Sequence, residues 1–428
     1  MFCLSLSLIS ICFAACKKSE NSALSAIPVN NAQTSEIPIS APGADAAEPV
    51  VAVAPDNSVY VAWVEHAAEK QADVFIRHFD AAQQPLGEAV RVNSEIGRAT
   101  AWRGDPPTVK VGGDGSVYVG WTARVAASSA NDLYLSVSPD NGKTFAAPVR
   151  VNDDTVPAAH GMHSLEIDKN GGVFVAWLDE RYLKNGAPPQ TTLPANDAKS
   201  DAGAAKHRHG EPNREVYFAV SSNGGKTFSA NKRIAENVCP CCKTALLSAP
   251  DNKLYIAWRQ VLDGDFRHIA ISSTSDGGNS FAPAAIVSDD RWQINGCPVS
   301  GAAMTADAEN NLKIVWYSAG AAGALGIYSA ESKDGGRTFS PRTLASDKAA
   351  SGTPVMIEDE KGKCRLVFSA NDKNVYSFVA QNAAADFGAL GQIKNAELPS
   401  AVVSNDKTVV AFIRNENGKR RIFLTTQN

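Results

Sequence analysis

The chain has 428 residues and a net charge of −4, from 41 basic and 45 acidic residues. Its length allows several domains or one large one, and its hydrophobic content is ample for a core. The small net charge comes without a basic block or an interleaving of basic and aromatic residues, so the composition argues against a nucleic-acid partner.

The chain begins with a short apolar run, residues 2–15, which ends immediately before Cys16. The run is too short to span a bilayer, and small residues precede the cysteine. It resembles a bacterial lipoprotein signal peptide. The resemblance implies that residues 1–15 are removed, that Cys16 is lipidated, and that the protein is exported and anchored to the outer membrane, facing the periplasm or the surface. A plain secretory peptide is the alternative.

Residues 16–48 are predicted to form a flexible tether, because they are polar and rich in Ala, Ser, Asn and Pro. A short strand near residues 35–40 is expected within this segment. The last unit of the chain, from about residue 398 to 427, has room for only three strands. The N-terminal strand would complete it and protect the edge of the sheet.

A short β-rich run that ends in an aromatic residue recurs throughout residues 49–428, each time after an Asp, Asn or Gly turn. This is the pattern of strand, turn and strand in a repeat protein. The five strong copies and the two weaker ones are residues 59–63, 117–121, 173–177, 254–258, 312–316, 364–368 and 408–412. The repeat predicts one large domain of seven similar β-units.

A turn motif that reads Ser/Thr-x-Asp/Asn-x-Gly-x-Thr/Ser-Phe occurs four times, beginning at Ser138, Ser221, Thr274 and Ser332. Its Asp or Asn can bond its own backbone, and its Gly can supply a positive φ. Such a turn closes a β-hairpin.

The motif resembles the Asp-box, or bacterial neuraminidase repeat, of the sialidase superfamily, and the resemblance covers roughly residues 49–428. It implies an all-β fold, a β-propeller of four-stranded blades, with seven blades favoured and six as the alternative. In that family the Asp-box joins the third and fourth strands of a blade, on the face away from the active site. It therefore indicates a fold and not a catalytic activity.

Four cysteines lie at equivalent positions of neighbouring repeats. Cys239 precedes Trp258 by nineteen residues, as Cys297 precedes Trp316. Counted back from the second strand of each blade, they fall in the link that enters the innermost strand, at the mouth of the central channel. The same offset in the preceding repeat leads to two histidines and a methionine. The residues expected at this mouth are Cys239, Cys241, Cys242, Cys297, His160, Met162 and His163.

This set favours a soft metal, copper or zinc, because thiolates and thioethers prefer Cu(I) or zinc and imidazole accepts either metal. Cys239, Cys242, Cys297 and one of the two histidines would supply four ligands. Cys241 should point the other way if the segment is extended. The alternative is structural, since a disulfide from Cys239 or Cys242 to Cys297 would join two blades in an oxidising compartment.

An irregular stretch, residues 183–214, is inserted between the second and third strands of one repeat. An insertion of this length in a compact repeat is usually functional or disordered. We interpret it as a lid that brings His207 or His209 over the site, with a solvated loop as the alternative.

Several polar residues are expected on the same rim. Arginines there suit an anionic ligand, because the guanidinium group binds carboxylate, phosphate or sulfate bidentately, and ion pairs between blades are the alternative. The resemblance implies that a catalytic sialidase would use three arginines, a Tyr with a neighbouring Glu, and an Asp. The candidates are Arg103, Arg181, Arg259, Glu180, Tyr182 and Tyr317. The family's Arg-Ile-Pro motif is missing.

The sequence therefore predicts a membrane-anchored, sialidase-like propeller lipoprotein that binds or handles a soft metal such as copper at its channel mouth. One alternative is an exo-α-sialidase-like glycoside hydrolase. Another is a non-catalytic propeller that binds a glycan or a protein and whose cysteines form structural disulfides. Whether the protein is an enzyme, and which oligomer it forms, is left open.

Overall fold

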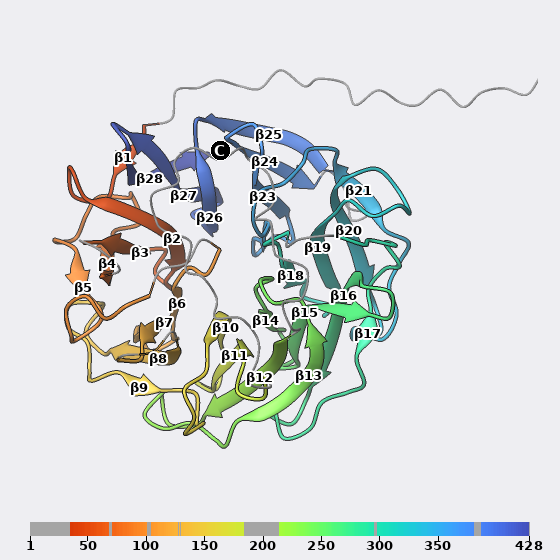
Figure 1. The fold of residues 1–428 in the computed structure, drawn as a ribbon. Coiled ribbons are helices and arrows are strands. Elements are labelled where there is room, and N and C mark those ends of the chain that lie inside the picture. Colours follow the sequence, from red (N-terminus) through yellow and green to blue (C-terminus); the bar gives the residue numbers. More distant parts are fainter. Residues whose placement is uncertain are drawn as a thin grey trace, which may run out of the picture.

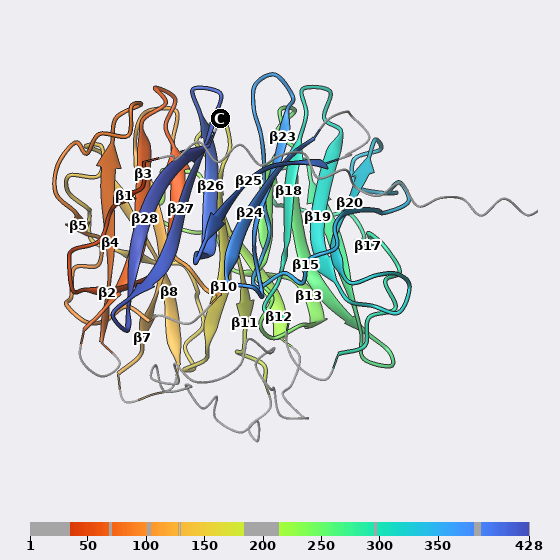
Figure 2. The ribbon, with the colours of Figure 1, turned by 90° about the horizontal axis from the view of Figure 1, so that it is seen from above.

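The computed structural model describes residues 35–67, 71–100, 104–126, 128, 130–183, 214–294, 298–380 and 387–427. Every regular element within these ranges is a β-strand, so the predicted all-β class is confirmed. The sheets are arranged as a ring around a central axis (Figure 1). In Figure 2 the strands run from one face of this ring to the other. Among the described residues, no helix has the length and apolar character needed to cross a membrane.

Five of the six sheets formed by the described strands have four strands each, paired antiparallel. The first contains β2 (Asp45–Val53), β3 (Val59–His66), β4 (Ala72–Phe79) and β5 (Val90–Arg91). The second contains β6 (Thr108–Val111), β7 (Val117–Arg124), β8 (Asn131–Ser138) and β9 (Val149–Arg150). Two more contain β18 (Ala302–Ala306), β19 (Leu312–Ser318), β20 (Gly326–Ser332) and β21 (Thr343–Ser346), and β22 (Val355–Glu358), β23 (Cys364–Ala370), β24 (Asn374–Ala380) and β25 (Phe387–Lys394).

The largest sheet has eight strands and consists of two four-stranded groups. One group is β10 (His160–Ile167), β11 (Val173–Asp179), β12 (Arg214–Ser221) and β13 (Lys232–Val238). The other is β14 (Ala245–Ser248), β15 (Leu254–Leu262), β16 (Phe266–Thr274) and β17 (Ala285–Ile286). Only the pair Val238 and Gln260 joins β13 to β15. The described strands thus form six hydrogen-bonded sheets but seven four-stranded groups.

The remaining sheet contains both the first and the last strands of the described chain. Its order is β1 (Ile37–Pro38), β28 (Lys419–Gln427), β27 (Lys407–Glu416) and β26 (Glu397–Ser404). β1 lies within the segment where a closing strand is expected, and it pairs antiparallel with β28. Pro38 is tolerated there because β1 is an edge strand. β2 begins at Asp45, before the predicted start of the domain at residue 49.

The recurring aromatic residues lie in the second strand of each group and form the core between groups. Trp63, Trp177, Trp258 and Trp316 are fully buried, and Phe368 and Phe412 take the same place in the two weaker copies. All seven residues of β11 are buried, since a neighbouring group covers each face of the strand. Burial of an aromatic side chain of this size contributes about 1.5–3 kcal/mol.

All four copies of the turn motif join the third and fourth strands of a group. In the first copy, Thr144 donates from its backbone N–H to Asp140 Oδ1 (2.9 Å) and from its hydroxyl to Asp140 Oδ2 (2.7 Å). The N–H of Gly142 donates to Ser138 Oγ (2.9 Å), with Gly142 at φ +78°. Because the strands alternate in direction, these turns lie on the face opposite the links between groups.

Candidate functional site

The cysteine segment is the link between β13 and β14. Its backbone is held from both sides: the N–H of Cys239 donates to the carbonyl of Arg259 in β15 (2.9 Å), and the N–H of Thr244 donates to the carbonyl of Met162 in β10 (3.0 Å). The side chains of Cys239, Cys241 and Cys242 are buried. The link therefore presents its three sulfurs inside the protein and not to solvent.

The three sulfur atoms lie within 4.8 Å of one another. The Sγ atoms of Cys242 and Cys239 are 3.3 Å apart, and those of Cys239 and Cys241 are 4.0 Å apart. The expectation that Cys241 points away is wrong, because the chain turns at Pro240 and Cys241 and side chains do not alternate there. We call these three residues the sulfur cluster.

Cys241 is disulfide-bonded, whereas Cys239, Cys242 and Cys364 are free. The predicted alternative that Cys239 or Cys242 forms the disulfide is wrong, since both are free thiols. As a disulfide sulfur, Cys241 is not a thiolate ligand for a metal in this state.

Positive charge surrounds the two free thiols. Arg267 of β16 donates from Nη1 to Cys239 Sγ (3.3 Å). The hydrogen bond from Cys242 is the largest effect that lowers the pKa of Cys239, and Arg267 and Arg259 lower it further against the effect of burial. Burial and the neighbouring Cys239 raise the pKa of Cys242. The pair is thus arranged as one thiolate that accepts a hydrogen bond from one thiol.

Arg259 does not reach a ligand at the channel mouth, because its side chain is fully buried. Its Nε and Nη2 donate to the carbonyl of Ser300 (3.1 and 3.0 Å), and Nη2 also donates to the carbonyl of Tyr317 (3.0 Å). Its guanidinium lies over the ring of Trp292 at 4.9 Å. Arg259 therefore joins two neighbouring groups, and Nη1 has no hydrogen-bond partner among the described residues.

The histidines predicted to join the cysteines have other neighbours. His160 Nε2 lies 3.1 Å from Asp154 Oδ1 and 3.4 Å from Asp179 Oδ2. Burial opposes the charged imidazolium, but hydrogen bonds to the two carboxylates outweigh it and raise the pKa of His160 to about 10. A protonated His160 has no lone pair for a metal. The side chain of His163 is buried with Nδ1 3.5 Å from Asp105 Oδ1.

Met162 is the one residue of this triplet that packs with the sulfur cluster, in the same buried apolar cluster. It occupies a β-bulge of β10 with φ +53°, and its N–H donates to Asp105 (2.8 Å). Among the described residues, the three cysteines alone bring the ligand atoms of three or more His, Cys, Asp or Glu side chains within 4.8 Å of one another. Four predicted site residues, Arg103, His207, His209 and Cys297, lie outside the described residues, as does Cys16.

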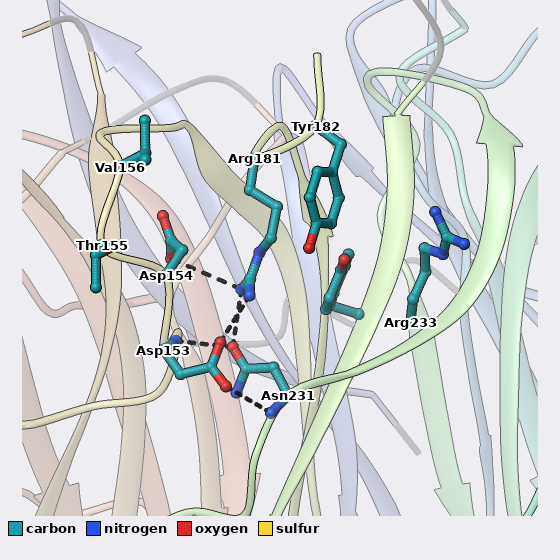
Figure 3. Close-up of a pocket in the computed structure, with 9 residues that line it drawn as sticks. Asp153, Asp154, Thr155, Val156, Arg181, Tyr182, Asn231 and Arg233 are labelled. Atoms are coloured by element: carbon teal, nitrogen blue, oxygen red, sulfur yellow. Dashed lines mark hydrogen bonds and ion pairs between the residues drawn. The ribbon is translucent and has the colours of Figure 1, made fainter. Parts of the chain in front are cut away.

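An open pocket of about 730 Å³ lies beside this region, between the link from β9 to β10 and the strands β11, β12 and β13 (Figure 3). It is lined by Asp153, Asp154, Thr155, Val156, Arg181, Tyr182, Tyr217, Asn231 and Arg233. Of these residues, Arg181 and Tyr182 are among the site residues predicted from the sequence. An available signal was the acidic pair Asp153-Asp154, which recurs in an equivalent link as Asp289-Asp290.

Arg181 is the centre of the pocket's polar network. Its Nη1 donates to Asp153 (2.6 Å), and its Nη2 donates to Asp179 (2.9 Å) and Asn231 (2.8 Å). Its guanidinium lies over the ring of Tyr217 at 4.3 Å. Figure 3 shows the guanidinium directed between the acidic link and Asn231. Arg181 is therefore already bound by carboxylates of this chain.

Two carboxyl groups of this network, those of Asp154 and Asp179, are held ionised. Burial works against ionisation of Asp154, but His160 and Asn152 hold its pKa at about 2. Burial also works against ionisation of Asp179, but His160 and Arg181 outweigh it and lower the pKa of this carboxyl group. Glu180 pairs with Arg214 (2.6 Å), whereas the neighbouring Tyr182 is 67% exposed. The sequence predicts that Glu180 and Tyr182 act as a pair. In the structure the carboxylate of Glu180 is instead bound to Arg214.

Comparisons with known proteins support the fold. No protein-family model matches the chain, and no curated protein matches it in sequence. A protein of unknown function from Dyadobacter fermentans has a similar structure, with a TM-score of 0.51 and 13% identity over 92% of this chain and 97% of that chain. The Hadza microbial sialidase Hz136 is similar with a TM-score of 0.50 and 12% identity, over 86% of this chain and 76% of that chain.

At these identities the likeness concerns the fold alone. Together with the ring of four-stranded antiparallel groups, it defines the protein as a β-propeller. The propeller is similar to that of a sialidase. Because one fold can carry many functions, the function of this protein has to be inferred from its side chains.

Proposed function

We propose that the protein is a sialidase-like propeller that binds a glycan in the pocket around Arg181 without hydrolysing it. The observation that carries this proposal is the pocket itself, which combines a fixed network of donors and acceptors with an exposed tyrosine, Tyr182. Sugars are recognised by such a set, because hydroxyl groups need both donors and acceptors and a sugar ring packs on an aromatic face.

The electrostatics of the pocket favour binding over hydrolysis. A glycosidase needs a carboxylic acid that keeps its proton near neutral pH, together with a nucleophile or base. Asp154 and Asp179 both have lowered pKa values, so neither carries a proton to donate. Burial raises the pKa of Tyr217, which disfavours its action as a nucleophile. Arg181 and Arg259 already have partners within the chain.

Titration calorimetry with sialylated and neutral oligosaccharides tests the proposal, beside turnover of a fluorogenic sialoside. We expect binding without turnover, and about tenfold weaker binding after Tyr182→Ala, which corresponds to about 1.4 kcal/mol. The control is Lys333→Ala, which removes an exposed side chain from a turn on the opposite face and leaves binding unchanged. Turnover lost on Arg181→Met would replace the proposal by a hydrolase, and an absence of glycan binding would reject it.

The four turns between third and fourth strands support a closer relation to the Asp-box proteins. In each turn the side-chain oxygen of the Asp or Asn accepts a hydrogen bond from the backbone N–H four residues later, which belongs to Thr144, Thr227, Ser280 or Thr338. A sialidase-superfamily origin is part of the proposal on this ground.

A soft-metal site is the second candidate function, favoured by the two free thiols that lie 3.3 Å apart. A Cu(I) ion on two thiolates carries a net charge of −1, which Arg267 and Arg259 would offset. Zinc requires four donors, and the described cluster offers two thiols and the thioether of Met162. Metal analysis of the reduced protein tests this, with loss of copper in Cys239→Ser and retention in Cys364→Ser as the expected result.

Export and a lipid anchor on Cys16 complete the proposal. The apolar run before Cys16 supports it, and the disulfide of Cys241 is typical of an oxidising compartment. Labelling with a radioactive fatty acid, lost on Cys16→Ser, is the test. Unlabelled protein secreted in soluble form would favour a plain signal peptide.

A further inference from the structure

The charged side chains of the pocket around Arg181 already have partners within the chain. We propose that this pocket binds uncharged oligosaccharides and rejects glycans that carry a carboxylate, such as sialosides. The inference rests on the proposed glycan binding, and it names the class of glycan. It follows from the pairing of the two arginines that line the pocket, from the charge of the groups around them, and from the apolar surface that is left exposed.

The guanidinium group of Arg181 has no free edge for a ligand carboxylate. A carboxylate is bound most firmly when two nitrogens on one edge of a guanidinium donate to its two oxygens. Nε and Nη2 form one such edge, and both donate to Asp179 Oδ2 (3.1 and 2.9 Å). Nη1 and Nη2 form the other edge, and they donate to Asp153 (2.6 Å) and Asn231 (2.8 Å) (Figure 3). The carboxylate of a sialoside would therefore have to displace a partner that belongs to the chain.

The second arginine of the pocket, Arg233 in β13, is also paired. Its Nη1 donates to Glu215 (2.9 Å), and its Nη2 lies 2.8 Å from Glu236. Two carboxylates thus share one guanidinium group. An anionic ligand at Arg233 would compete with both of them, and it would meet negative rather than positive net charge there.

Negative charge is in excess around the pocket. The lining itself is neutral, because two acidic residues, Asp153 and Asp154, accompany two basic ones, Arg181 and Arg233. The side chains that pair with this lining add three carboxylates and one imidazole, those of Asp179, Glu215, Glu236 and His160. The imidazole is positively charged, since burial opposes its protonation but hydrogen bonds to two carboxylates raise its pKa to about 10. A further carboxylate from a ligand would be repelled.

An uncharged sugar can use the apolar surface of the pocket instead. Tyr182 and Val156 both line it, and they are 67% and 65% exposed. A sugar ring packs its apolar C–H face on such side chains and leaves no charge to be desolvated. The exposed side chains therefore favour a neutral ring, while the paired charges beneath them disfavour an acidic one.

The test uses pairs of glycans that differ only in a terminal sialic acid. A glycan array with sialylated and unsialylated forms of lactose, N-acetyllactosamine and N-acetylgalactosamine shows which sugars wild-type protein binds. Titration calorimetry then measures both members of the best pair. At low salt the uncharged member should bind about tenfold tighter than its sialylated counterpart.

The dependence on salt distinguishes repulsion from poor fit. The affinity for the sialylated member should rise between ionic strengths of about 0.01 M and about 0.1 M, because the Debye length falls from about 30 Å to about 10 Å. A sialylated sugar that binds at least as tightly at low salt and weakens as salt is added would overturn the inference and leave glycan binding intact. A preference for the uncharged member that does not change with salt would overturn it too. Failure of every sugar to bind would reject the proposed function itself.

A substitution near Arg233 tests the source of the repulsion. Glu236→Gln removes one negative charge with little change of shape, and it should narrow the preference for the uncharged member by about threefold. Glu331→Gln is the matched control, since it removes a carboxylate from β20 in another four-stranded group and should leave the preference unchanged. The salt series on wild-type protein needs no substitution, so a variant that does not fold leaves the test intact.

Discussion

The imidazole of His160 lies 3.1 Å from the carboxylate of Asp154, on the wall between the pocket and the start of β10. This ion pair replaces the metal coordination that the sequence predicted for His160. It also connects the pocket with the strand that packs beside the sulfur cluster, since the backbone of Met162 follows two residues later in β10.

The pair predicts a loss of stability at alkaline pH. The pKa of His160 is raised to about 10 in the folded protein from an ordinary value of 6.5. The stabilisation is therefore complete below pH 6.5 and is lost as the pH rises toward 10. His160→Gln should lower the free energy of unfolding at pH 6.5 by about 3–5 kcal/mol, the cost of breaking a buried ion pair.

Urea unfolding between pH 6.5 and 10 measures this effect, and the difference between wild type and His160→Gln should shrink as the pH rises. His66→Gln is the control. Burial is the largest effect that lowers the pKa of His66, so this histidine contributes no stability that disappears in that range. A constant difference for His160→Gln across the range would contradict the prediction.

Substitution of two adjacent glycines in the third turn motif distinguishes the effect of backbone strain on stability from the effect of side-chain crowding. Gly277 and Gly278 have φ values of +69° and +90°. A Cβ on Gly277 would meet no atom within 4 Å, whereas a Cβ on Gly278 would overlap the ring of Phe218 in the preceding group. Gly277→Ala should cost about 1–2 kcal/mol from the left-handed conformation alone. Gly278→Ala should cost about 1–3 kcal/mol more, from overpacking.

Thermal unfolding of the two glycine variants provides the comparison. Because Phe218 also packs edge to face with Phe281 at 5.1 Å, the clash should loosen the contact between the two groups. Equal stability of both variants would show that the turn moves away from Phe218 without cost.

Substitution of Arg259 tests whether this residue stabilises the fold or binds a ligand. Its donations to the carbonyls of Ser300 and Tyr317 join neighbouring groups, and its side chain is fully buried. Arg259→Ala leaves these two carbonyls without a donor and should lower the free energy of unfolding by about 2–6 kcal/mol, at about 1–3 kcal/mol for each. Glycan affinity per folded molecule should stay unchanged. Exposed Arg337→Ala is the control and should be neutral. A stable Arg259→Ala protein with weakened binding would assign the arginine to the ligand site.

The N-terminal segment is expected to be an integral part of the fold. Ile39 is 3% exposed and packs in one apolar cluster with Val409, Ile413 and Leu424 of the last sheet. Ile39→Ala should cost about 2–5 kcal/mol. Ile37→Ala, at a less buried site of the same segment, should cost less, as measured by urea unfolding. An equal and negligible effect of both would mean that the last sheet is stable without this segment.

Much of the fold could be predicted because the pattern repeats. The runs that end at Trp63 and Phe412 both lie in second strands, although the latter is a weak copy. The repeat offset also indicated that the link before β14 and strand β10 are neighbours, as the hydrogen bond from Thr244 to Met162 shows. Equivalent positions in a repeat are reliable guides to where the backbone lies.

The side chains of the site could not be predicted in the same way. Extended geometry was assumed for Cys241, but a turn at Pro240 brings its sulfur to the other two. The charge of His160 depends on Asp154 and Asp179, which approach from the preceding link and from the neighbouring strand. Such contacts depend on side-chain rotamers and on burial, and the repeating pattern of the sequence predicts neither of them.

The pairing of β1 with β28 has a consequence for the order of folding. During synthesis, Ile37 and Pro38 emerge long before their partners Leu424 and Phe423. This contact spans nearly the whole chain, so it carries a high loop-closure cost and forms late. The pairing of β1 with β28 can therefore form only after the chain of every other four-stranded group has been synthesised. A circularly permuted chain, with the old ends linked and new ends opened in the 332–339 turn, would turn that late contact into a local one and should fold faster.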